Sequence, residues 1–260
     1  MAISPNSGGM RLRLVACEVM YREFCHVVAS SPHTVDMEFV PKGLHDLGAE
    51  PMRARLQAVL DAVPEGMYDA VLLGYGLCNN GIAGLAARTT PLIVPRAHDC
   101  ITLFLGSKER YEEYFHSHPG VYFKTSGWIE RGNIAQDLMP QTVQHRAGMD
   151  RTYQQLVEKY GEDNARYLYE TLCNTTRNYS QFTFIEMGVE PDDRFEQQTR
   201  EDADERGWRF EKVRGDLRLF RKLVNGEWDP AEFLVVPPGH RITAPLDPYI
   251  IASEETCVDP

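Results

Sequence analysis

The feature that most constrains the fold is the alternation of short apolar runs with amphipathic segments near the N-terminus. Each apolar run predicts a strand, and each segment with apolar residues three or four apart predicts a helix. The expected strands are Arg11–Cys17, Val35–Val40, Tyr68–Tyr75 and Pro91–Pro95, and the expected helices are Glu18–Ala29, Pro51–Val63, Gly81–Ala87 and Cys100–His116. Strands that alternate with helices form parallel sheets through right-handed crossovers. The sequence therefore predicts an α/β fold of Rossmann-like architecture.

The same alternation resumes in the second half of the chain. Gly120–Trp128 is expected to form a strand, and Asp150–Arg177 one long helix that breaks at Gly161. The later strands are expected at Phe182–Met187, Trp208–Val213 and Phe233–Val236, and the later helices at Arg194–Arg206 and Leu217–Val224. This pattern predicts two α/β lobes around a cleft. The first lobe is expected over residues 11–130, and a helical connection with a second α/β unit over 131–243. Residues 1–10 are expected to form a disordered tail and 244–260 a C-terminal tail.

Charge and hydropathy exclude two classes of partner. The 260 residues carry a formal charge of −11, from 38 acidic and 27 basic side chains. Such a surface repels phosphate backbones, and no basic stripe of the kind that binds nucleic acid occurs. The apolar runs are too short to cross a bilayer, and residues 1–10 lack the apolar segment of a signal peptide. We therefore expect a cytoplasmic protein that binds neither nucleic acid nor membrane.

Three of the six cysteines follow predicted strands. Cys17 ends the first strand, Cys78 lies in the loop GYGLCNNG after the third, and Cys100 follows the fourth in PRAHDC. No CxxC pair occurs, which argues against a structural zinc ribbon. Because parallel strands present their carboxyl ends along one edge of a sheet, we expect these three thiols to converge. The alternative is that each cysteine only packs in the interior, where this residue type is common.

Three converging thiols predict a metal site. Thiolates select zinc or an iron–sulfur cluster, and both zinc and [4Fe-4S] stay open as the cofactor. Three protein ligands with one open position are the arrangement of catalytic zinc. Glu18, His98 and Asp99 adjoin these cysteines in sequence and are the candidate acid and base residues. His98 is also a candidate ligand.

Four further residues are expected to contact a small-molecule substrate. Gly76 would let a ligand approach the backbone, and Asn79 and Asn80 could donate hydrogen bonds to it or cap the next helix. Arg96 could pair with a substrate carboxylate, or with Glu18 or Asp99. The loop reads GxGxxxxG, which departs from both the dinucleotide-binding and the phosphate-loop motifs.

Four sequence blocks resemble the bacterial and archaeal family known as domain of unknown function 1638. They are ACE at Ala16–Glu18, LLGYGLCNNG at Leu72–Gly81, PRAHDCITLFLGSKERY at Pro95–Tyr111 and GDLRLFRKLVNGEWD at Gly215–Asp229. The similarity extends from about Arg11 to Ile242. The family offers no established reaction. Its members often occur beside corrinoid-dependent methyltransferases, so the resemblance implies a link to one-carbon metabolism and a methyltransferase protein as a possible partner.

Three interpretations follow. The first is a metal–thiolate enzyme, a transferase, lyase or hydrolase, that uses Cys17, Cys78 and Cys100. The second is a non-catalytic accessory or metal-handling partner of a corrinoid methyltransferase system. The third is an enzyme without metal, in which Cys100 is the nucleophile and His98 its base.

Overall fold

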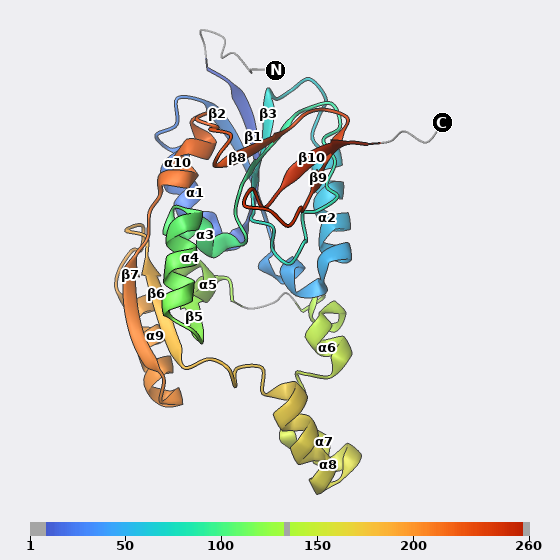
Figure 1. Cartoon of the computed structure of the whole chain (residues 1–260), viewed down its shortest axis with the longest axis vertical. Coiled ribbons are helices and arrows are strands. Elements are labelled where there is room, and N and C mark those ends of the chain that lie inside the picture. Colours follow the sequence, from blue (N-terminus) through green and yellow to red (C-terminus); the bar gives the residue numbers. More distant parts are fainter. Residues whose placement is uncertain (1–8, 133–135, 257–260) are drawn as a thin grey trace.

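A five-stranded sheet forms the centre of the molecule (Figure 1). The computed structural model describes residues 9–132 and 136–256. The strand order is β2-β1-β3-β4-β8, with β1 at Arg11–Cys17, β2 at Thr34–Val40, β3 at Ala70–Gly74, β4 at Leu92–Pro95 and β8 at Phe233–Val236. The first four strands are parallel to one another, and β8 pairs antiparallel with β4. The predicted α/β fold and the parallel order of the first, third and fourth strands are confirmed.

Helices cover both faces of this sheet, which explains why β3 is apolar throughout. All five residues of β3 are buried, as is typical of a parallel strand that is covered on both sides. One hydrophobic cluster joins Leu14 and Leu72 to α1 (Tyr21–Val28), α3 (Cys100–Leu105) and α10 (Arg218–Val224). The other joins Val15 and Leu73 to α2 (Ala49–Asp61) and the 3-10 helix η2 (Lys42–Leu47). A further 3-10 helix, η1 (Glu18–Met20), connects β1 to α1.

A second, three-stranded parallel sheet lies beside the first. Its order is β5-β6-β7, with β5 at Val121–Lys124, β6 at Gln181–Glu186 and β7 at Arg209–Arg214. Helices α4 (Lys108–Ser117), α5 (Ser126–Glu130) and α9 (Arg194–Arg206) accompany it. The chain then returns through α10 and β8 to the first sheet. We call the part built on the five-stranded sheet the first unit and the part built on the three-stranded sheet the second. The segment that follows the second unit, α10 and β8, completes the core of the first.

Several boundaries differ from those the sequence predicts, each for a local reason. Gly81–Ala87 is not a helix: its first four residues form turns, and Ala86 forms an isolated bridge to Arg241. The expected helix Cys100–His116 is two helices, because Gly106 adopts a φ of 85° and the Ser107 side chain caps α4. Within Gly120–Trp128 only the first part is a strand. The Thr125 side chain accepts the Trp128 N–H and starts α5 there.

The long helix expected at Asp150–Arg177 is divided. It breaks at Gly161, as predicted, into α7 (Tyr153–Tyr160) and α8 (Glu162–Leu168), and a π-helical turn follows at Tyr169–Cys173. Together with α6 (Val143–Ala147) and the 3-10 turn Met139–Gln141, these helices extend away from the two sheets (Figure 1).

The C-terminal part of the chain is more ordered than the sequence indicates. β10 (Ala252–Glu255) lies inside the range expected as a tail, and it pairs antiparallel with β9 (His240–Thr243), which comes just before that range. Ile250 and Ile251 are buried. Of the expected tail over residues 1–10, residues 1–8 lie outside the described part of the chain.

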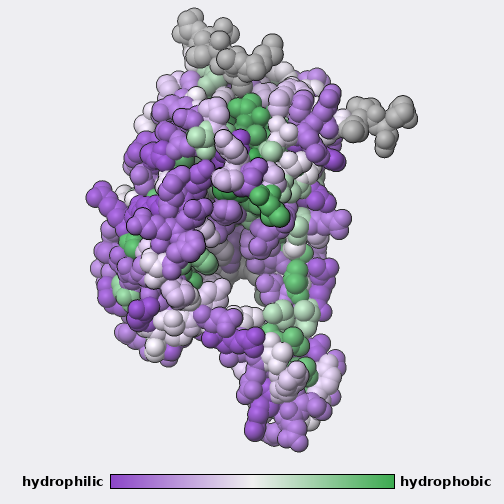
Figure 2. All heavy atoms as spheres, in the orientation of Figure 1, coloured by the Kyte–Doolittle hydropathy of each residue, from purple (hydrophilic) through white to green (hydrophobic). Residues whose placement is uncertain are grey.

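The face of the molecule that Figure 2 shows is mostly polar. Hydrophobic residues on the face shown in Figure 2 occur in small separate groups. Within the described residues, no helix is long and apolar enough to cross a membrane.

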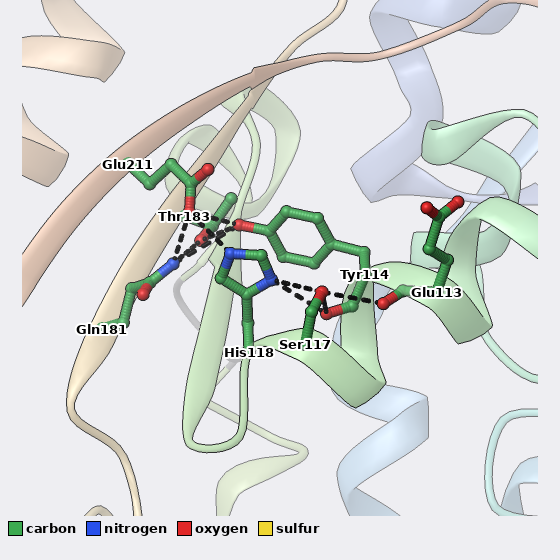
Figure 3. A network of polar contacts seen from close by, with 7 residues as sticks. All are labelled: Glu113, Tyr114, Ser117, His118, Gln181, Thr183 and Glu211. Atoms are coloured by element: carbon green, nitrogen blue, oxygen red, sulfur yellow. Dashed lines mark hydrogen bonds and ion pairs between the residues drawn. The ribbon is translucent and has the colours of Figure 1, made fainter.

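A network of polar side chains fastens α4 to the three-stranded sheet (Figure 3). The Tyr114 hydroxyl and Gln181 Nε2 both donate to Glu211 Oε2, at 2.8 Å each. His118 Nε2 lies 3.4 Å from the same oxygen, and its ring stacks on Tyr114. Burial raises the pKa of Tyr114 to about 12, so its hydroxyl keeps the proton that it donates. These groups satisfy one another, and the network is a structural cross-link.

Glu23 on α1 is a buried acid whose carboxyl group has no hydrogen-bond or ion-pair partner in the described residues. Its side chain is fully buried, and neither carboxylate oxygen has a hydrogen-bond partner within the described residues. Burial raises its pKa from 4.5 to about 8. The folded protein therefore keeps a proton that the unfolded chain releases, and stability falls as the pH rises between these two values.

We predict that Glu23→Gln flattens this pH dependence. The amide cannot ionise, so the variant should lose the slope of up to about 1.4 kcal/mol per pH unit that one such group contributes. Urea unfolding between pH 5 and pH 9 measures the effect. Glu201→Gln, a matched change at an exposed position of α9, should leave the slope unchanged. Parallel pH profiles for wild type and Glu23→Gln would contradict the assignment.

Candidate functional site

The three cysteines at the strand ends line one small pocket. Cys17, Cys78 and Cys100 all contribute to its wall, at the carboxyl edge of the five-stranded sheet. The pocket has a volume of about 30 Å³, enough for one or two waters or a single ion. Parallel order of β1, β3 and β4 thus brings together three thiols that are far apart in sequence.

Gly76 allows the loop after β3 to run against the loop after β4. A Cβ at this position would lie 2.7 Å from the Asp99 Cα, so a larger residue would push the two loops apart. Two backbone hydrogen bonds close the contact, from Leu77 N to Ala97 O at 2.8 Å and from Cys78 N to His98 O at 2.9 Å. This approach places Cys78 beside Cys100. Gly76 therefore acts through the position of Cys78.

A left-handed turn holds Cys78 in the pocket. Cys78, Asn79 and Asn80 have φ values of 47°, 55° and 63°. Asparagine adopts this conformation more readily than most residues, whereas for cysteine it costs roughly 1–2 kcal/mol. The Asn79 and Asn80 side chains are exposed and do not line the pocket. The two asparagines favour the turn. The strained backbone of Cys78 lies at the candidate site, where such strain is common in proteins.

Trp128 closes the pocket from the second unit. Its helix α5 packs against η1, where a Cβ on Gly127 would overlap the carbonyl oxygen of Val19. Only glycine permits this contact. The Lys42 ammonium lies over the Trp128 ring, 4.5 Å from its centroid, and Lys42 also lines the pocket.

Burial in the pocket disfavours the charged thiolate form of its three cysteines. It raises the pKa of Cys17 to about 11 and that of Cys78 to about 12, and it raises the pKa of Cys100 well above its usual value. Repulsion from the Cys17 thiolate also raises the pKa of Cys78, and Cys78 and Cys17 together raise that of Cys100, whereas Lys42 lowers that of Cys17. A cation inside the pocket would offset the repulsion among thiolates.

Two buried polar atoms near the thiols lack partners. The Tyr75 hydroxyl and the Trp128 indole nitrogen have no hydrogen-bond partner of adequate geometry in residues 9–132 and 136–256. Both residues line the pocket. Buried polar groups are rarely left unsatisfied in native proteins, so each such group requires an explanation. The Tyr75 hydroxyl faces the Cys17 thiol and the Trp128 indole faces the Cys100 thiol, and a polar ligand in the pocket would offer each of them a hydrogen bond of better geometry.

The candidate acid and base residues lie around the pocket, and none of them lines it. Glu18 Oε1 accepts the Lys42 N–H at 2.8 Å and so joins η1 to η2. Asp99 accepts the N–H groups of Ile101 and Thr102 and caps α3. The His98 side chain is exposed, with its ring stacked on Tyr111.

Arg96 also lies outside the cysteine pocket. Its guanidinium donates to the backbone carbonyl oxygens of Pro230, Tyr249 and Ile251, and it lines a different recess. These bonds tie the C-terminal segment to the end of β4. They are neither of the ion pairs that the sequence analysis considered.

His45 is the pocket histidine that sequence reasoning missed. It lies on η2, which follows β2, and it lines the pocket together with the three cysteines. The carboxyl end of β2 reaches the same sheet edge as the ends of β1, β3 and β4, which is the signal that could have identified it. Within the described residues, no three His, Cys, Asp or Glu side chains are already grouped closely enough to hold a metal ion.

We predict that Gly127→Ala opens the pocket. The added methyl group would force α5 away from Val19 and carry Trp128 with it, so the pocket thiols should react faster with a thiol reagent in the native protein. Glu205→Ala is the control, because Glu205 is exposed on α9 and does not line the pocket. Equal thiol reactivity in the two variants would show that α5 does not cover the site.

Comparison with known proteins gives a family and no reaction. The sequence matches the family described as "Protein of unknown function (DUF1638)" over residues 39–224, more than two thirds of the chain. This span includes Cys78, Cys100 and Trp128. No curated protein and no solved structure matches the chain. The chain therefore belongs to the DUF1638 family of proteins of unknown function, the family that its sequence blocks resemble.

Proposed function

We propose that this protein is a metal–thiolate enzyme that binds one thiophilic metal ion through Cys17, Cys78 and Cys100. The observation that carries the proposal is that three thiols from three strand ends line a single pocket of about 30 Å³. That space suits one ion better than a cluster of several atoms, which favours zinc over [4Fe-4S]. The thiols would have to move closer together as the ion enters, because they are not already grouped as ligands.

The surroundings of the pocket support the proposal. All five cysteines in the described residues are free, as in the reducing cytoplasm where we place the chain. The Lys42 ammonium and the Trp128 ring cover the thiols and would restrict the access of water. Glu18 adjoins Cys17, and we assign it to proton transfer although its Oε1 also accepts the Lys42 N–H just outside the pocket.

The site supports a class of reactions and not one particular reaction. A bound zinc ion would activate a thiol or water for transfer, elimination or hydrolysis of a small molecule. The link to one-carbon metabolism and to a corrinoid methyltransferase rests on the family resemblance. The positions of Asp99, Asn79, Asn80 and Arg96 give each of them a structural role, so we do not assign Asp99 to catalysis or the other three to the substrate.

A second candidate is a non-catalytic metal-handling protein. Two observations favour it: the pocket has room for an ion but not for a substrate, and His45 offers a fourth ligand. The His45 Nδ1 lies 3.6 Å from Asp46 Oδ1, so a carboxylate that could accept its N–H is close to the ring but not yet within hydrogen-bond distance. Four protein ligands would close the site, whereas a catalytic zinc site keeps one position open.

We predict that the protein purified without oxygen carries about one zinc ion per chain. Cys17→Ser, Cys78→Ser and Cys100→Ser should each lose most of the metal, because each removes a thiolate ligand. Cys25→Ser is the control, since Cys25 is partly buried and does not line the pocket. Elemental analysis measures the metal, and thermal unfolding verifies that each variant folds. Retention of full metal content in all three pocket variants would refute the assignment.

His45→Ala separates the enzyme from the metal-handling protein. If His45 is a ligand, the variant should bind zinc at least about tenfold more weakly, as the loss of one ligand interaction implies. If the fourth position is open, the variant should bind zinc as the wild type does. His26→Ala, on α1 outside the pocket, is the matched control. Glu18→Gln should keep the metal in either case.

A further inference from the structure

A second recess lies at the carboxyl edge of the three-stranded sheet. Met187 follows β6 and Gly215 follows β7, and both line an open cleft of about 490 Å³. Ligands of open α/β sheets bind beyond the carboxyl ends of parallel strands. The described lining of this cleft shares no residue with that of the cysteine pocket. The cleft is therefore a separate candidate site.

Three arginine side chains converge on this cleft. Arg110 comes from α4, Arg214 ends β7 and Arg221 comes from α10. The Arg110 guanidinium donates to the carbonyl oxygens of Leu105 and Arg214, which fixes its position. In the described part of the chain, the guanidinium groups of Arg214 and Arg221 have neither a hydrogen-bond nor an ion-pair partner. A cluster of three cations is unexpected in a chain with a net charge of −11.

One carboxylate shares the cleft with these arginines. Asp216 Oδ1 accepts the N–H of Arg218 at 2.8 Å, and this bond holds the carboxylate at the start of α10. Against three guanidinium groups it leaves an excess of two positive charges in the cleft. Such an excess, in a recess with a low-dielectric wall, concentrates anions.

We propose that this cleft binds the phosphate group of a small molecule. Guanidinium groups match the oxygens of phosphate in paired hydrogen bonds, and a phosphate dianion would balance the two excess charges. A single carboxylate would balance only one. The buried side chains of Met187 and Leu217 form the apolar part of the wall. The cleft volume lies within the range of about 300–1,000 Å³ that small-molecule sites occupy.

This assignment gives a role to a sequence block that the cysteine pocket does not use. The block GDLRLFRKLVNGEWD begins at Gly215 and supplies Asp216, Leu217 and Arg221 to the cleft. Helix α3 separates the two sites. Its six residues begin at Cys100, and a helix of that length is about 9 Å long. At the other end of this helix, Asp216 N donates to the carbonyl oxygen of Phe104 at 2.9 Å, so the cleft begins where α3 ends.

Calorimetric titration with inorganic phosphate at pH 8 tests the proposal, with acetate at matched ionic strength as the monoanion. Phosphate should bind saturably and more tightly than acetate. The double variant Arg214→Ala/Arg221→Ala should weaken phosphate binding at least about tenfold, since hydrogen bonds between charged groups are lost. Arg209→Ala removes an exposed arginine from the opposite end of β7 and should change the affinity by less than about twofold.

Three results would overturn the proposal. The first is the absence of saturable phosphate binding to the wild type. The second is an equal loss of affinity in Arg209→Ala, which would mean that phosphate responds only to net charge. The third is acetate binding as tight as that of phosphate, which would reassign the cleft to carboxylates. Urea unfolding of each variant verifies that the changes leave the fold intact.

Discussion

Parallel pairing of β1, β3 and β4 is the constraint on which the candidate site depends. Because the three strands run in one direction, their carboxyl ends meet along one edge and deliver Cys17, Cys78 and Cys100 to one pocket. Reversal of any one strand would send its cysteine to the opposite edge. All five residues of β3 are apolar or glycine and buried. Helices cover this strand on both faces, which favours a position between the other two strands.

Two close backbone contacts, one at Gly76 and one at Gly127, complete the pocket that the sheet begins. Gly76 brings the loop of Cys78 against the loop of Cys100, and Gly127 brings α5 against η1 so that Trp128 covers the thiols. The first contact joins two loops at the carboxyl edge of the five-stranded sheet, and the second joins the two units. The site therefore requires both units, although its three cysteines come from the first.

Much of this arrangement could be predicted from the sequence, since strand order and the carboxyl-edge rule suffice to place the cysteines. The rest depends on side-chain directions that no periodicity encodes. His98 adjoins a pocket cysteine in sequence and yet lies on the surface, whereas His45 follows β2 and lines the pocket. The sequence predicts that Trp128 ends a strand, but the Thr125 side chain caps a helix there, and the Trp128 ring lines the pocket. Arg96 forms carbonyl contacts with a segment more than a hundred residues away.

X-ray absorption at the zinc edge of the metal-loaded protein tests the central claim most directly, because it counts the sulfur atoms bound to the metal. The account predicts three sulfur neighbours at about 2.3 Å, with the remaining position filled by nitrogen or oxygen at about 2.0–2.1 Å. A spectrum with only nitrogen and oxygen neighbours, or with one sulfur, would show that the three thiols do not act together as a metal site.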